Sequence, residues 1–134
     1  MRSTKIVTSF IKNNERLLIL KRSDKVKTMK GLWAGISGII EKNEEPLQRA
    51  KIEIFEEVGI TDKQITLLKS AEGMRVTSPQ YIDHEWEIFS FLFESNNPTI
   101  TLNWENSDFK WIKIKDLKDY ETVPNLQKVL FNLL

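Results

Sequence analysis

Residues 38–60 read GIIEKNEEPLQRAKIEIFEEVGI and contain the most informative pattern of the chain. Within it, Glu53, Glu56 and Glu57 stand at positions i, i+3 and i+4 of one predicted helix. Side chains at this spacing are neighbours on a helix surface, so the three carboxylates would repel one another without a cation between them. Carboxylate oxygens are the ligands that Mg²⁺ prefers. The stretch therefore predicts a divalent-cation site on a helix.

Local signals predict where this helix begins and ends. Pro46 suits the first helical position, where its missing N–H costs nothing, and Gly59 suits the left-handed residue that ends a helix. We expect a helix from about Pro46 to Val58, preceded by a left-handed Asn43. The expected apolar face, with Phe55 at its edge, consists of Leu47, Ala50, Ile54 and Val58. The opposite face is expected to carry Arg49, Glu53, Glu56 and Glu57.

The spacing around the helix resembles a known family signature. Gly38, Glu44, the glutamate cluster and Gly59-Ile60 match the Nudix hydrolase pattern of glycine, five residues, glutamate, seven residues and Arg-Glu-apolar-x-Glu-Glu-x-Gly-apolar. The preceding residues 33–38, WAGISG, resemble the family's Trp-x-x-Pro-Gly-Gly lead-in. The resemblance implies an α+β fold, the Nudix α/β/α sandwich with a mixed central sheet flanked by helices. We expect residues 1–134 to form one such domain.

One position departs from the signature. Ile52 stands where the family has the arginine that helps to orient and charge-balance the helix carboxylates. Arg49 lies four residues before Glu53, one helical turn away, so we hypothesise that Arg49 pairs with Glu53 in its place. Glu44 has two interpretations: an acid near the helix N-terminus that interacts with the macrodipole, or a supporting member of the site.

The resemblance also implies the chemistry. In the family, Mg²⁺ is held by the helix glutamates and a backbone carbonyl, here Glu53, Glu56, Glu57 and Gly38, and Mn²⁺ is a second suitable ion. Water then attacks a phosphorus of a nucleoside triphosphate or nucleoside diphosphate derivative and releases a nucleoside monophosphate. The general base is Glu53 or the later Glu105, which lies six residues before Trp111. The predicted catalytic residues are thus Glu53, Glu56 and Glu105.

Three residues are candidates for substrate binding. Arg22 ends a predicted strand and has a planar guanidinium that can grip a phosphate bidentately. Arg75 is a weaker phosphate-binding candidate, and Trp33 is a candidate platform for a nucleobase. Taken singly, each of these residues has an ordinary structural alternative as a solvated charge or core aromatic. Glu85 and Glu87 read as the outward positions of a strand.

Composition limits the remaining possibilities. The 134 residues carry a net charge of +1, which gives no broad reason to expect nucleic-acid or membrane binding, and disfavours trimming of RNA ends. There is no cysteine, which excludes disulfides, thiolate metal sites and the cysteine-dependent isopentenyl diphosphate isomerases that share the fold. We expect a cytoplasmic protein with a small nucleotide as its partner, and a homodimer is common in the family. The rival hypothesis is a non-catalytic Nudix module that senses a nucleotide or nucleotide-sugar, with Ile52 marking decay of the active site.

The rest of the chain is predicted to be mainly sheet. We expect a first hairpin of Lys5–Ile11 and Arg16–Lys21, a loop over Arg22–Lys30 and a short strand at Trp33–Ile36. Later strands are expected at Ile65–Leu68, Met74–Thr77, Glu85–Glu94, Thr99–Asn103 and Phe109–Ile114. A helical turn at Lys115–Tyr120 and a helical, sheet-packing segment at Pro124–Leu134 complete the prediction.

Overall fold

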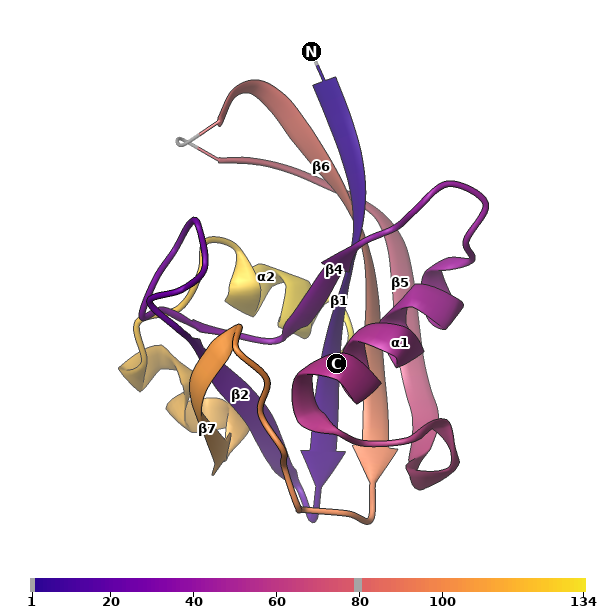
Figure 1. The fold of residues 1–134 in the computed structure, drawn as a ribbon, viewed down its shortest axis with the longest axis vertical. Coiled ribbons are helices and arrows are strands. Elements are labelled where there is room, and N and C mark those ends of the chain that lie inside the picture. Colours follow the sequence, from indigo (N-terminus) through magenta and orange to yellow (C-terminus); the bar gives the residue numbers. More distant parts are fainter. Residues whose placement is uncertain (1, 79–80) are drawn as a thin grey trace.

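The computed structural model describes residues 2–78 and 81–134 and shows a strongly bent sheet with helices on both sides (Figure 1). The strands are β1 (Arg2–Asn13), β2 (Arg16–Arg22), β3 (Trp33–Ala34), β4 (Ile36–Ile39), β5 (Ile65–Ser78), β6 (Tyr81–Ser95) and β7 (Asn106–Ile112). The helices are α1 (Pro46–Val58) and α2 (Leu126–Phe131), with 3₁₀ segments η1 (Asp62–Gln64) and η2 (Ile114–Asp119).

Strand β1 organises the sheet. It pairs in parallel with β6 and antiparallel with β2 and β4, while β5 pairs antiparallel with β6. Strands β3 and β7 both pair antiparallel with β2. The sheet is therefore mixed, as the family resemblance implied.

Alternation along the strands produces two cores, one on each face of the sheet. In β2, Leu18 and Leu20 pack on the face covered by α1, whereas Leu17 and Ile19 pack on the face covered by α2. Figure 1 shows α1 in front of the sheet and α2 on its far side. The expected α/β/α sandwich is confirmed.

Helix α1 begins and ends where its local signals predicted. Pro46 occupies its first turn, Gly59 follows it with φ 76°, and the Gly59 N–H donates to the Phe55 carbonyl at 3.0 Å. Asn43 has the expected left-handed backbone, with φ 68°. The division into an apolar and a charged face was wrong in one respect, because Glu53 and Glu57 are buried with the apolar residues while Phe55 is 58% exposed.

Several other predictions differ from the structure. Thr99–Asn103 forms no strand; instead the Thr101 N–H donates to the Val58 carbonyl at 3.0 Å, so the segment runs past the end of α1. The two short strands predicted at residues 65–68 and 74–77 are one bulged strand, β5. The expected strand Trp33–Ile36 is divided between β3 and β4.

The first hairpin and the C-terminal segment agree more closely with expectation. The tight turn between β1 and β2 places positive φ on Asn14 and Glu15. The segment after residue 124 does pack on the sheet, but regular helix covers only Leu126–Phe131. The predicted helical turn near residue 115 is η2.

Candidate metal centre and substrate cavity

Three carboxylates from two distant segments meet beside α1. One oxygen from each of Glu53, Glu57 and Glu105 lies within 4.8 Å of the other two. Glu53 and Glu57 are one turn apart on α1, and Glu105 lies just before β7. We call these three residues the carboxylate trio.

Glu57 is the most buried member of the trio. Its side-chain Oε1 accepts a hydrogen bond from Asn106 Nδ2 at 3.1 Å, while Oε2 is buried without a hydrogen-bond donor among the described residues. Burial, followed by the neighbouring Glu105 charge, raises the pKa of Glu57 well above its ordinary value of 4.5. An unpartnered buried carboxylate oxygen beside two further carboxylates fits a divalent cation, which would satisfy the oxygen and the accumulated charge.

Glu53 is held between α1 and β4. Its Oε1 accepts a hydrogen bond from Arg49 Nη1 at 3.2 Å. The carboxyl group also lies against Gly38, where a Cβ atom would overlap it. Burial raises the pKa of Glu53, the Arg49 hydrogen bond opposes this shift, and the charges of Glu56 and Glu105 add to it. A side chain at position 38 would therefore displace the Glu53 carboxyl group from this position.

Arg49 joins Glu53 to Glu44. Its Nε and Nη2 atoms donate to the two carboxylate oxygens of Glu44 at 2.9 and 2.6 Å. This bidentate contact holds the pKa of Glu44 below its ordinary value. The hypothesised pairing of Arg49 with Glu53 is present, and Glu44 also accepts the Glu41 N–H at 2.7 Å.

Glu105 is positioned by its own loop. Asn103 accepts the Glu105 N–H at 3.1 Å and donates from Nδ2 to Glu105 Oε1 at 3.2 Å. The Glu105 carbonyl accepts the N–H of Ser23, whose hydroxyl donates to the Trp104 carbonyl. The end of β2 thus fixes the loop that carries this carboxylate.

Glu56 is not brought into the trio. At i+3 from Glu53 it is rotated about 100° away from Glu57 around the helix axis, and its side chain is exposed. Its charge still raises the pKa of Glu53, so it lies near the site. A role for Glu56 as a ligand or catalytic residue stays a prediction.

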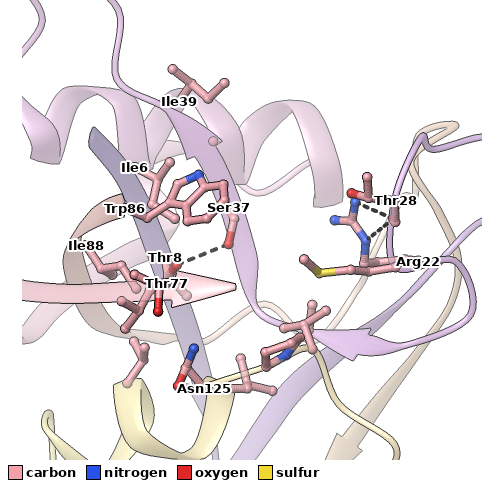
Figure 2. A pocket seen from close by; sticks show the side chains of 18 of the residues that line it. Ile6, Thr8, Arg22, Thr28, Ser37, Ile39, Thr77, Trp86, Ile88 and Asn125 are labelled. Carbon is pink, nitrogen blue, oxygen red and sulfur yellow. Dashed lines mark hydrogen bonds between the residues drawn. The ribbon is translucent and has the colours of Figure 1, made fainter. Parts of the chain in front are cut away.

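A cavity of about 430 Å³ opens beside the trio, between β4, the β5–β6 pair and the start of α2 (Figure 2). Glu105 and Gly38 lie in its wall, so the cavity and the carboxylates are continuous. Apolar groups dominate the rest of the lining, and Trp86 lies on the β6 side with Asn125 on the α2 side. Asn125 has a left-handed backbone, φ 70°, and its side chain does not cap α2.

Arg22 lies in the cavity wall, as expected for a residue that meets substrate. Its Nε and Nη2 donate to the Thr28 carbonyl at 3.2 and 3.0 Å, which fixes the guanidinium plane (Figure 2). Its positive charge is one of the influences that lower the pKa of Glu57 against the effect of burial. Arg22 is therefore close enough to serve both the trio and the cavity.

The other two predicted substrate-binding residues lie elsewhere. Trp33 is only 9% exposed and packs edge-to-face on Tyr120 with ring centroids 5.4 Å apart, so it belongs to the core and does not line the cavity. Arg75 pairs with Glu85 at 2.6 Å. It does not line the cavity, although its strand neighbours Val76 and Thr77 do.

Sequence reasoning missed the groups that support the site. Asn106 and Ser23 are buried polar residues whose contacts with Glu57 and Trp104 span more than 40 residues of sequence, so no local pattern predicts these contacts. Trp86 was not among the predicted substrate-binding residues, yet it is half-buried in the cavity wall. Asn125 gave only the weak signal of an asparagine before a helix.

The Nudix domain family model matches residues 2–133 of this chain. The chain belongs to the Nudix family. Among curated relatives of this Nudix protein, nucleoside triphosphatase NudI of Escherichia fergusonii is 31% identical over 97% of this chain and 96% of its own length.

Solved structures agree on the fold. A C. elegans Ap4A hydrolase in a binary complex has a TM-score of 0.77 at 19% identity, covering 96% of this chain and 93% of its own. The MutT protein of Methanosarcina mazei Go1 has a TM-score of 0.75 at 21% identity, covering 98% and 91%. Family and relatives together identify this Nudix protein as a hydrolase that acts on acid anhydrides in phosphorus-containing substrates. No helix among residues 2–78 and 81–134 is long and apolar enough to cross a bilayer.

Proposed function

We propose that this protein is a Mg²⁺-dependent pyrophosphohydrolase that cleaves a nucleoside triphosphate and releases a nucleoside monophosphate. Glu105 carries the proposal, because it belongs both to the carboxylate trio and to the wall of the cavity. A polyphosphate whose nucleoside occupies the cavity would therefore reach the trio. The 31% identical relative named as a nucleoside triphosphatase favours a triphosphate over a nucleoside diphosphate derivative.

The trio would hold the cation. Glu53, Glu57 and Glu105 offer hard oxygen ligands, and the Gly38 backbone, which packs against Glu53, is the predicted additional ligand. When bound, Mg²⁺ neutralises phosphate charge and lowers the pKa of a coordinated water. Mn²⁺ suits the same oxygen ligands. Glu53 and Glu57, whose ionised forms are each disfavoured by burial and by the Glu105 charge, gain most from such an ion.

Side chains around the trio and the cavity would supply phosphate binding, proton transfer and base recognition. Arg22, fixed by Thr28, presents positive charge to phosphate at the cavity wall. The proton acceptor for the attacking water is Glu53 or Glu105, since both lie in the trio. Trp86 offers a ring for stacking against a nucleobase, and the Asn125 amide offers one donor group and one acceptor to its edge.

A substrate panel tests the proposal. Purified protein with Mg²⁺ should release a monophosphate from at least one of the common, deoxy or oxidised nucleoside triphosphates, faster than from ADP-ribose, dinucleoside polyphosphates or nucleotide sugars. Glu57→Gln is the matched inactive control. Product release from a nucleotide sugar or dinucleotide alone would contradict the triphosphate assignment.

The same panel separates catalysis from sensing. If no nucleotide is hydrolysed, yet one of them raises the melting temperature of the protein, the non-catalytic sensor hypothesis replaces the pyrophosphohydrolase. Ile52, in place of the signature arginine, is the observation that favours this rival.

A further inference from the structure

Arg49 is enclosed by carboxylates. Its guanidinium makes three hydrogen bonds, two to Glu44 and one to Glu53, and its side chain is only 16% exposed. The Glu44 and Glu53 side chains are 17% and 12% exposed. A charged network this sheltered is not an ordinary solvated helix surface.

The position of Arg49 on α1 does not serve the helix itself. It is the fourth residue of a helix that begins at Pro46, and the positive end of the macrodipole disfavours a cation there. The last turn of α1, where a cation is favourable, has no basic residue. The two carboxylates therefore account for the arginine, and one of them belongs to the trio.

The hydrogen bonds of Arg49 also fix the orientation of its guanidinium group. Two parallel hydrogen bonds to Glu44 lock the plane of the guanidinium, which leaves Nη1 to meet Glu53 Oε1 at 3.2 Å. The Gly38 backbone lies against the same carboxyl group, where a Cβ atom would overlap it. Glu53 is thus held by a fixed cation and packed against a residue that has no side chain.

We propose that Arg49, anchored by Glu44, is the positioning residue for Glu53, and takes from one turn earlier the role that the family signature gives to position 52. The half-buried Ile52 can make no hydrogen bond with its side chain, so the charge that orients the site has moved along the helix. The inference rests on the proposed function of the trio as a cation site. If the inference holds, Ile52 marks a relocation of the arginine along the helix and not decay of the active site.

Four variants test the relocation: Arg49→Ala, Arg49→Lys, the double variant Arg49→Ala with Ile52→Arg, and Lys51→Ala. Lys51 is the control, because it is also a cation of α1 but pairs with Asp62 at 2.7 Å, away from the trio. The readouts are the Mn²⁺ dissociation constant without nucleotide, measured by electron paramagnetic resonance, the melting temperature of the metal-free protein, and kcat and KM with Mg²⁺.

Arg49→Ala should weaken Mn²⁺ binding and lower kcat by about 10- to 100-fold, the usual effect of removing a partner of a metal ligand, with a smaller change in KM. Arg49→Lys keeps the charge but loses the bidentate grip, so it should fall between Arg49→Ala and the wild type. Returning arginine to position 52 in the double variant should recover most of the lost Mn²⁺ affinity. Lys51→Ala should match the wild type.

Mn²⁺ affinity and kcat in Arg49→Ala within about twofold of the wild type would overturn the inference, whatever happens to the melting temperature. Failure of the double variant to recover Mn²⁺ affinity would overturn the relocation. If Arg49→Ala does not fold, the Arg49→Lys variant tests the inference in its place. Mn²⁺ affinity equal to that of the wild type in Arg49→Lys would contradict the positioning role of Arg49. If the wild-type protein binds Mn²⁺ but hydrolyses no nucleotide, the proposed function is wrong. The Mn²⁺ dissociation constants of the variants would still test the positioning role of Arg49.

Discussion

Asn106 Nδ2 donates a hydrogen bond to Glu57 Oε1 at 3.1 Å across 49 residues of sequence, and it thereby ties the start of β7 to helix α1. Both side chains are buried, and the second oxygen of Glu57 points where no described residue donates to it. One oxygen is therefore hydrogen-bonded within the described residues and the other is not. This division makes Glu57 the member of the trio whose environment most favours a cation.

Removing the Asn106 amide should affect both folding and the site. Asn106→Ala leaves a buried carboxyl without its donor, so the free energy of unfolding should fall by about 1–3 kcal/mol. Mn²⁺ affinity should also fall, because Glu57 is no longer oriented. Urea unfolding and Mn²⁺ titration measure the two effects, with the exposed Asn96→Ala as control. Equal stability in the two variants would show that the hydrogen bond contributes nothing.

The glutamates of α1 should not be equivalent. Glu57→Gln should lose at least about 100-fold in kcat, more than the loss typical for a partner of a ligand, because Glu57 is the most buried member of the trio. Glu56→Gln should lose less, since its side chain is exposed outside the trio. Steady-state kinetics on the best triphosphate gives the order, and a larger loss in Glu56→Gln would reverse the assignment.

The stability of the metal-free protein should depend on pH through Glu57. Burial raises the pKa of Glu57 well above 4.5, so the folded state keeps a proton that the unfolded chain releases. Above pH 4.5 the unfolded state therefore binds fewer protons, and the free energy of unfolding falls with rising pH until Glu57 ionises in the fold.

Thermal melts from pH 4.5 to neutrality, with chelator present, should show a shallower fall for Glu57→Gln than for the wild type. Added Mn²⁺ should oppose the fall, since it binds the ionised form. Parallel pH profiles for the two proteins would mean that Glu57 does not hold its proton in the fold.

Trp86 and Trp33 should respond differently to substitution. Trp86→Leu should raise KM several-fold with little change in kcat, because Trp86 lines the cavity. Trp33→Leu should instead lower the melting temperature by several degrees, since the ring is buried in the core against Tyr120. Steady-state kinetics and thermal melts of both variants measure these effects. A raised KM in Trp33→Leu but not in Trp86→Leu would show that Trp33, and not Trp86, stacks against the nucleobase.

Features that depend on residues close together in the sequence were predicted, whereas contacts between distant residues were not. The limits of α1 were predicted because Pro46 and Gly59 act on their own backbone, and the pairing of Arg49 with Glu53 follows from one helical turn. The resemblance supplied Glu105, which no local pattern would join to Glu53. By contrast, Asn106 and Ser23 depend on the approach of β7 and β2, which sequence spacing does not encode.

The wrong predictions have a similar cause. Ile100 and Leu102 alternate as in a strand, and they do pack on the core with α1, but the backbone between them donates to the end of α1 and not to a neighbouring strand. Glu56 and Glu57 look alike in the sequence, yet burial distinguishes them only when the helix is docked on the sheet.

The most direct test of the central claim is a crystal structure of the protein grown with Mn²⁺, with the ion located by its anomalous scattering. We predict an anomalous peak within coordination distance of carboxylate oxygens from Glu53, Glu57 and Glu105. A bound nucleotide should lie in the adjoining cavity. A peak held elsewhere, or an ion coordinated by Glu56 with Glu57 and Glu105 turned away from it, would contradict the account.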